Sequence, residues 1–175
     1  FFKKGDYRAG YYRDQTLLMA QGLLSVSNIF ASLYADLDLK REPMSGGRQM
    51  GGHFMTANKN QSNEWLNLLK IKNHSGDISP TGSQMPRLLG LAQASKIYRN
   101  LKIKNSKNFS DKGNEIAWGT IGNASTSEGM FFEAINAAGV LQVPMVISIW
   151  DDGYGISVSN EEQTTKQSIS EALKG

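Results

Sequence analysis

Apolar residues form two short runs in the second half of the chain, residues 116–121 and 145–150. Each run is rich in β-favouring residues and too short for a typical helix. Between them, from Met130 to Ala138, the pattern is that of a helix. Ser125 stands three residues before Glu128, a spacing that predicts a capping box at the start of this helix. The pattern therefore predicts a β-α-β unit with two parallel strands.

Helical patterns also occur outside this unit. Ser25 or Ser27 can cap a helix over residues 26–34, and Ser83 can cap one over residues 83–99. Two strands are too few for an open sheet that is covered on both faces. We therefore expect a piece of a longer polypeptide, with the missing strands after Gly175. The helical segments are residues 16–22, 26–34, 83–99 and, with sparse apolar positions, 160–174.

Polar residues follow both strands of the predicted unit. Asn123 comes after the first strand, and Asp151 and Asp152 come after the second. Because parallel strands end at the same edge of a sheet, we expect these side chains to converge. A helix that begins after Asn123 would present free N–H groups to a phosphate, and carboxylate and amide oxygens suit Mg²⁺. The sequence therefore predicts a magnesium–diphosphate site.

The composition bounds the class of protein without identifying it. The 175 residues suffice for one domain, and the net charge of +3 is too small to indicate a nucleic-acid partner. The lack of cysteine excludes disulfides and thiolate metal sites, and no apolar run of about 18 residues is present to span a membrane. We expect a soluble, cytoplasmic protein that binds neither nucleic acid nor membranes.

Three segments together resemble the motif that binds thiamine diphosphate: residues 122–124, 126–129 and 151–157. That motif runs Gly-Asp-Gly, then a helix, then Asn-Asn. More narrowly, the chain from Tyr7 to Ser157 resembles the alpha subunit of the decarboxylating component of 2-oxo acid dehydrogenase complexes. The resemblance implies a thiamine diphosphate-binding fold, which is a doubly wound α/β fold with a mostly parallel sheet. It implies that residues 1–175 are a partial, alpha-type diphosphate-binding domain of a longer chain.

The resemblance also implies a set of metal ligands. In the family they are the Asp of the first motif half, the second Asn of the other half, and a backbone carbonyl two residues later. These positions are Asn123, Asp152 and the carbonyl of Tyr154, so the amide and the carboxylate are exchanged between the two halves. The number of oxygens and the charge are unchanged by the exchange. We expect strand alternation to point Asp151 away from the metal.

Further cofactor contacts follow from the same resemblance. Ala124 replaces a motif glycine and Ser125 begins the expected helix, so both are predicted to offer N–H groups to the diphosphate. Tyr12 and Arg13 match a Tyr-Arg pair that holds the diphosphate, a task to which the forked guanidinium is suited. Ser79 and Thr81 match a loop under the thiazolium and diphosphate. Branched-chain members of the family place a potassium ion at this loop, which here would involve Pro80, Ser83 and Gln84.

The segment from Gly46 to Phe54 resembles the branched-chain members more than the pyruvate members. It favours a branched-chain substrate but leaves pyruvate open. The segment contains His53, and the one other histidine of the chain is His74. We assign neither as a general base, because a lone histidine is more often structural than catalytic.

The implied activity is the oxidative decarboxylation of a 2-oxo acid, with transfer of the acyl group to the lipoyl arm of an acyltransferase. In the family, the glutamate that activates the cofactor belongs to a beta-type domain. We therefore expect the fragment alone to be inactive, and the active site to form with that domain, in a separate subunit or the same chain. Two alternatives are a transketolase-type enzyme and a subunit that has lost the cofactor. A plain structural domain is the simplest remaining interpretation.

Overall fold

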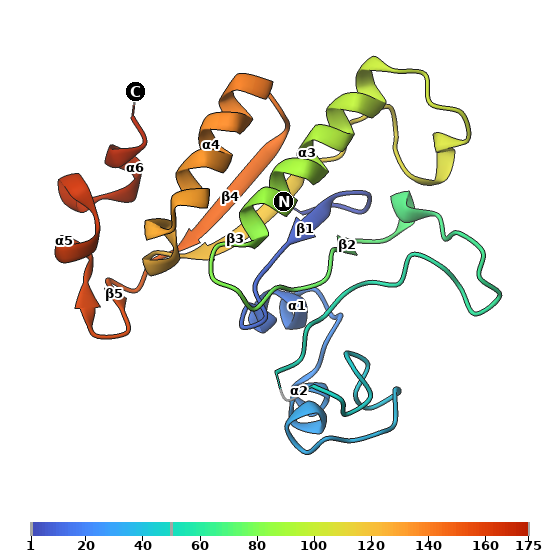
Figure 1. The fold of residues 1–175 in the computed structure, drawn as a ribbon. Coiled ribbons are helices and arrows are strands. Elements are labelled where there is room, and N and C mark those ends of the chain that lie inside the picture. The colour runs from blue at the N-terminus through green and yellow to red at the C-terminus, as the bar shows by residue number, and fades with distance from the viewer. Residues whose placement is uncertain (1, 50, 175) are drawn as a thin grey trace.

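The computed structural model describes residues 2–49 and 51–174. Its centre is a parallel sheet in the order β2-β1-β3-β4 (Figure 1). The two predicted strands are present as β3 and β4, and they pair in register along their whole length. The predicted β-α-β unit is therefore confirmed. The strands are β1 (Tyr7–Ala9), β2 (Asn73–His74), β3 (Ala117–Gly122) and β4 (Met145–Trp150).

The expectation that the missing strands follow Gly175 is wrong for two of them, because β1 and β2 come from the first half of the chain. Gly175 itself lies outside the described residues. Both strands are too short and too polar to give a strand pattern. The buried Asn73 is held by side-chain hydrogen bonds instead, its Nδ2 donating to the carbonyls of Gly5, Asp6, Leu68 and Ile71.

The helices agree with the patterns in place and type up to α4, whereas the segment 160–174 forms two four-residue helices with a 3₁₀ turn between them instead of one helix. Ser25 caps α2 in a capping box with Asn28, as expected for one of the two candidate serines. Ser83 occupies the N-cap position of α3, although its side chain makes no capping hydrogen bond. Among the described residues, no helix has the length and apolarity needed to cross a membrane. The helices are α1 (Gln15–Ala20), α2 (Val26–Leu33), α3 (Gln84–Asn100), α4 (Gly129–Leu141), α5 (Asn160–Gln163) and α6 (Ile169–Ala172).

The capping box predicted for Ser125 and Glu128 is wrong. Residues 124–127 form a 3₁₀ turn, η3 (Ala124–Ser127), and α4 begins only at Gly129. Glu128 takes the N-cap position of α4 without a side-chain hydrogen bond. The tight turn forms because Thr126 is buried and its hydroxyl donates to the carbonyl of Asn123 at 2.6 Å.

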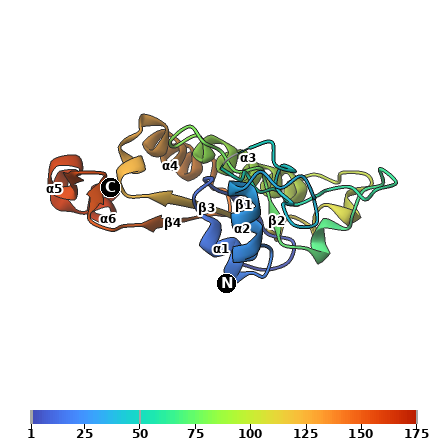
Figure 2. The same ribbon diagram turned by 90° about the horizontal axis from the view of Figure 1, so that it is seen from below.

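Helices cover both faces of the sheet. α3 and α4 lie on one face and α1 on the other (Figure 2). On the first face, Gly119 is required, because a Cβ there would lie 2.3 Å from Leu88 of α3. The doubly wound, parallel α/β fold expected from the sequence is confirmed. The core on this face consists of Ala9, Met85, Leu88, Ala92, Ala117, Ile121, Phe131, Ala134 and Ile169.

After β4, a small antiparallel hairpin returns the chain to the end of the sheet. Its strands are β5 (Tyr154–Gly155) and β6 (Val158–Ser159), and α5 follows directly. The hairpin lies beside η3 and the end of β4 (Figure 1). It therefore places residues from three segments around one edge of the sheet.

Candidate functional site at the carboxyl edge of β3 and β4

A cavity of about 520 Å³ lies where β3 and β4 end. It brings together most of the residues that were predicted to bind the metal and the diphosphate. Those on its wall are Arg13, Asn123, Ala124, Ser125, Asp152 and Tyr154. The expected convergence at this edge of the sheet is therefore observed, while the roles of the individual residues remain predictions.

The side chain of Asn123 is oriented by a chain of hydrogen bonds. Its Nδ2 donates to the Tyr154 carbonyl at 3.1 Å and to Oδ1 of Asn160 at 2.7 Å. The Nδ2 of Asn160 donates in turn to Asp151 at 2.8 Å. Because the Asp151 carboxylate can only accept, it fixes the orientation of both amides. Among the described residues nothing donates to Asn123 Oδ1, so this oxygen is free for a ligand.

Two further oxygens lie beside this amide. Asp152 accepts the N–H of Tyr154 through one oxygen at 3.1 Å, and its other oxygen has no partner within the described part of the chain. The Tyr154 carbonyl has a second lone pair besides the one that accepts from Asn123. An amide oxygen, a carboxylate and a carbonyl are the hard donors that Mg²⁺ prefers, so the residues present fit this ion. No group of three His, Asp or Glu side chains competes as a metal site within residues 2–49 and 51–174.

The expectation that Asp151 points away from the site is wrong. β4 ends at Trp150, so strand alternation no longer applies at the next residue. Asp151 lines the same cavity as Asp152, and its carboxylate accepts from the N–H of Gly153 and from Asn160. It therefore acts on Asn123 through Asn160.

Arg13 approaches the cavity from the segment between β1 and α1. Its guanidinium lies 4.9 Å from the centroid of the Tyr11 ring and 5.3 Å from that of Tyr12, and it donates to the Tyr12 hydroxyl at 3.2 Å. Tyr12 lines a neighbouring cavity of about 300 Å³, to which Arg13 also contributes. The arginine thus connects the two cavities and is exposed to a ligand.

Ala124 and Ser125 stand in η3 and not in a helix that begins after Asn123. The amides near the cavity are therefore those of a four-residue 3₁₀ turn, and the N-terminus of α4 lies farther along the chain. This corrects the expectation of a helix N-terminus at Ser125. The physical reason is the buried Thr126, which closes the turn.

Ser79 is not among the residues that line the cavity, but it contacts a histidine that stacks on Tyr12. Its hydroxyl is hydrogen-bonded to Nε2 of His53, whose Nδ1 donates to the carbonyl of Gly51 at 2.7 Å. The His53 ring stacks on Tyr12 with 5.4 Å between centroids. Thr81 is exposed in the turn before α3 and is not among the residues that line the cavity. Met50, in the segment that resembles branched-chain members, lies outside the described residues.

Sequence patterns assign no role to Asn160, His53 and His74, which the structure holds in side-chain hydrogen bonds. Asn160 carried no signal, because only the β5–β6 hairpin returns it to Asn123. The sequence offers no residue that would pair with His53, and its stacking on Tyr12 appears only in the folded structure. The other histidine, His74, is buried in β2, at the edge of the sheet opposite β4, and burial, with Arg8 and Lys72, lowers its pKa to about 3. His74 is therefore neutral at physiological pH.

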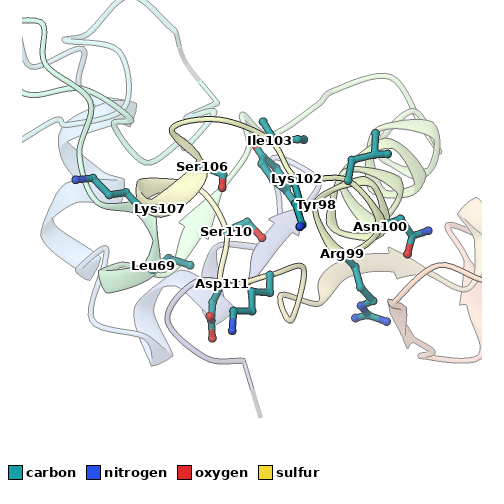
Figure 3. Close-up of a pocket in the computed structure, with 12 residues that line it drawn as sticks. Leu69, Tyr98, Arg99, Asn100, Lys102, Ile103, Ser106, Lys107, Ser110 and Asp111 are labelled. Atoms are coloured by element: carbon teal, nitrogen blue, oxygen red, sulfur yellow. The ribbon is translucent and has the colours of Figure 1, made fainter.

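A larger cavity, of about 710 Å³, lies elsewhere, beyond the end of α3 (Figure 3). It is lined by Tyr98 and by residues of the loop that follows, including Lys102, Ser110 and Asp111. None of the predicted site residues contributes to it. The first residue of α3, Gln84, donates to the Thr120 carbonyl near the carboxyl end of β3 at 3.0 Å. The end of α3, and with it this cavity, therefore lies toward the amino ends of the strands.

The fold is that of a parallel α/β domain, a class that commonly binds ligands at the carboxyl ends of neighbouring strands, and the cavity lies at these strand ends. The sequence profile described as "Dehydrogenase E1 component" matches residues 1–175. The chain belongs to this family of dehydrogenase components.

Two relatives show where in the family the similarity lies. The chain is 30% identical to the 2-oxoisovalerate dehydrogenase subunit alpha of Bacillus subtilis (strain 168), over 97% of the chain and 42% of the relative. It is 24% identical to the mitochondrial pyruvate dehydrogenase E1 component subunit alpha of Dictyostelium discoideum, over 92% of the chain and 34% of the relative. The chain thus spans less than half the length of either relative. Its alpha-type resemblance is confirmed, and it is more similar to the 2-oxoisovalerate protein of the two.

Proposed function

We propose that this chain supplies the magnesium–diphosphate site of a thiamine diphosphate-dependent 2-oxo acid dehydrogenase. The observation that carries the proposal is that Asn123, Asp152, Tyr154 and Arg13 line one cavity, where Asn123 Nδ2 and the Tyr154 N–H hold these residues together through the Tyr154 carbonyl and the Asp152 carboxylate. Oxygen donors next to a guanidinium suit a cation and a diphosphate together. Membership of the dehydrogenase E1 component family supports the same reading of the site.

Each residue has a binding or orienting task in this proposal. Asn123, Asp152 and the Tyr154 carbonyl hold Mg²⁺, while Tyr12 and Arg13 bind the diphosphate. The N–H groups of Ala124 and Ser125 add hydrogen bonds from η3. Ser79, oriented by His53, and Thr81 lie on the loop proposed to pass under the thiazolium. Thiamine diphosphate, when bound, supplies the carbanion chemistry by which a 2-oxo acid loses CO₂.

In the proposed potassium loop, Gln84 offers a side-chain oxygen that could ligate a cation. It is buried, its Nε2 donates to the Thr120 carbonyl, and its Oε1 has no partner among the described residues. A buried oxygen without a partner is costly, and a cation would satisfy it. We keep a potassium site at Pro80, Ser83 and Gln84 as part of the proposal.

The substrate in this proposal is a branched-chain 2-oxo acid, with pyruvate as the alternative. The higher identity to the 2-oxoisovalerate relative supports this order. A beta-type domain completes the active site, a lipoyl-bearing acyltransferase accepts the acyl group, and the fragment alone is inactive. We propose a cytoplasmic location for the whole.

The principal alternative is a structural subunit that has lost the cofactor. Random decay gives no reason for an amide and a carboxylate to exchange places, or for Asn160 and Asp151 to orient the amide at the site. A transketolase-type activity shares the metal motif, but the chain belongs to the dehydrogenase component family. Both observations favour a working dehydrogenase site.

Calorimetry on the full-length protein with its beta-type partner tests the proposal. We expect thiamine diphosphate to bind only with Mg²⁺, and Asp152→Ala to abolish binding by removing the one carboxylate of the ligand set. Asp111→Ala, an exposed aspartate beside the cavity beyond the end of α3, is the matched control and should bind as wild type. Absence of binding by the wild-type assembly would support the structural subunit instead.

A further inference from the structure

Arg8 is the central residue of β1, and its side chain is fully buried. Its Nη2 lies 3.0 Å from Asp14 and its Nη1 lies 3.0 Å from Asp77, forming two ion pairs. Nη2 also donates to the hydroxyl of Thr120 at 3.3 Å. One guanidinium therefore joins three segments that are far apart in the sequence.

Each of these segments carries part of the proposed cofactor site. Asp14 directly follows Arg13, and the same Asp14 oxygen accepts the N–H of Tyr11 at 3.0 Å. Thr120 lies on β3, three residues before Asn123. The hydrogen bond between the Thr120 hydroxyl and Asp14 closes this part of the network.

Asp77 provides the connection to the third segment. Its second oxygen accepts the N–H of Phe54 at 3.1 Å, so it holds the residue that follows His53. Asp77 is also two residues before Ser79, the partner of His53. Fixing Asp77 therefore fixes both members of the His53–Ser79 pair.

Burying the ion pairs of Arg8 costs hydration free energy, so a gain in stability does not explain why they are present. A buried ion pair loses hydration that its attraction barely restores, and apolar replacements are often as stable. Nε of Arg8 has no partner among the described residues. The backbone also makes room for the guanidinium, since a Cβ on Gly10 would lie 1.9 Å from Nη2. What the forked guanidinium provides is a fixed geometry between two carboxylates, which a lysine cannot reproduce.

We propose that Arg8 is a positioning residue, which sets the Tyr12–Arg13 segment and the His53–Ser79 pair relative to the end of β3. It acts through Asp14, Asp77 and Thr120 and does not itself touch the cofactor. The inference rests on the proposed function, because the segments that Arg8 joins are those proposed to bind thiamine diphosphate.

The test compares Arg8→Lys and Asp77→Asn with wild type, in the full-length protein with its beta-type partner. We expect the Kd of thiamine diphosphate at saturating Mg²⁺ to rise about tenfold or more in both variants, since weakening about one hydrogen bond to the charged diphosphate has an effect of this size. At saturating cofactor, kcat should stay within about twofold of wild type, because the reacting groups are unchanged. Asp14 is left intact because it lines the cavity itself.

Asp6→Asn is the matched control. Asp6 is a buried carboxylate at the other end of β1, where it accepts the N–H groups of Lys3 at 2.8 Å and Ile116 at 2.9 Å. This variant should lower the melting temperature without changing the cofactor Kd. If Arg8→Lys does not fold, Asp77→Asn, which keeps the cation and the shape of the side chain, still provides the comparison.

The outcomes separate the two proposals. Failure of the wild-type assembly to bind thiamine diphosphate would overturn the proposed function, and this inference with it. Binding by wild type with an unchanged Kd in the variants would overturn the role of Arg8 alone, even if both variants melt at lower temperature. A rise in Kd that the Asp6→Asn control shares would likewise reduce Arg8 to a structural residue.

Discussion

At the scale of single residues, the amide of Asn123 distinguishes this site. It donates to two acceptors, the Tyr154 carbonyl and Oδ1 of Asn160. An aspartate at position 123 would set a negative oxygen against both, without a hydrogen to place between them. The amide at position 123 therefore belongs with the carboxylate at position 152, and the exchange noted in the sequence has a structural reason.

Asn160→Ala tests this arrangement. Without Asn160 the Asn123 amide is free to turn, so we expect the Mg²⁺ affinity of cofactor binding to fall by about 10–100-fold, the usual cost of losing an outer partner of a metal ligand. Calorimetric titrations of thiamine diphosphate at several Mg²⁺ concentrations measure this. Glu161→Ala, the exposed next residue of α5, is the control. An unchanged Mg²⁺ requirement in Asn160→Ala would contradict the positioning of Asn123.

Sequence reasoning located the residues at strand ends because their position depends on chain connectivity alone. Asn123 and Asp152 meet because parallel neighbouring strands finish at one edge. The direction of Asp151 and the involvement of Asn160 depend on the β5–β6 hairpin, which sequence periodicity did not predict. Side-chain contacts made by such irregular segments require the folded structure.

At the scale of elements, the junction between β3 and α4 differs most from the prediction. The helix itself was predicted within a few residues, since its apolar spacing is regular. The start of the helix differs from the prediction because Ser125 lies within the 3₁₀ turn η3, while Glu128 follows that turn and occupies the N-cap position of α4. A capping signal shows that a helix can start, but the buried Thr126 decides where it does.

The packing of the β5–β6 hairpin on η3 gives a second prediction. A Cβ on Gly155 would lie 2.5 Å from the Cβ of Ala124, so Gly155→Ala should destabilise the protein by about 1–3 kcal/mol. The Nε2 atom of Gln163 would also lie 2.5 Å from this Cβ, so adding Ala124→Gly removes one of the two close contacts and should restore part of that loss. Urea unfolding of both variants measures the coupling.

Gly139→Ala is the control for this pair. Gly139 lies inside α4 with nothing within 4 Å of an added Cβ, so alanine there should stabilise the helix by about 0.5–1 kcal/mol. If the double variant is no more stable than Gly155→Ala alone, the two residues do not share one space.

At the scale of the whole molecule, the sheet is held together from both halves of the chain. β3 and β4 were predictable because each is a continuous apolar run. β1 and β2 were not, because they comprise three and two residues and contain Arg8, Asn73 and His74. Arg8 pairs with the nearby Asp14, but its contacts to His74 and Asp77 join positions more than 60 residues apart in the sequence, which no local pattern can reveal.

The buried His74 makes stability depend on pH. Burial, with Arg8 and Lys72, lowers its pKa in the folded protein to about 3, while the unfolded value is 6.5. As the pH falls below 6.5, the unfolded chain takes up a proton that the folded protein does not, so stability is lost at about 1.4 kcal/mol per pH unit. Between pH 6.5 and 5 this amounts to about 2 kcal/mol.

His74→Gln should remove this loss. We expect the difference in unfolding free energy between wild type and variant to be constant above about pH 7.5 and to shift in favour of the variant as the pH falls. Urea unfolding of the complete protein at pH 5, 6, 7 and 8 measures it. A difference that does not change with pH would show that His74 is protonated equally in both states.

The pairing of β1 with β3 also determines when the site can exist during folding. The unit from β3 through α4 to β4 occupies adjacent sequence and can form early, whereas Arg8 meets Thr120 only across a separation of 112 residues. Contacts of such long range form late, because a long loop must close first. A ribosome-bound chain therefore makes the Tyr12–Arg13 segment before β3. Until β3 has been made, Asp14 and Arg8 lack their contacts to Thr120, so the cavity at the end of β3 cannot form.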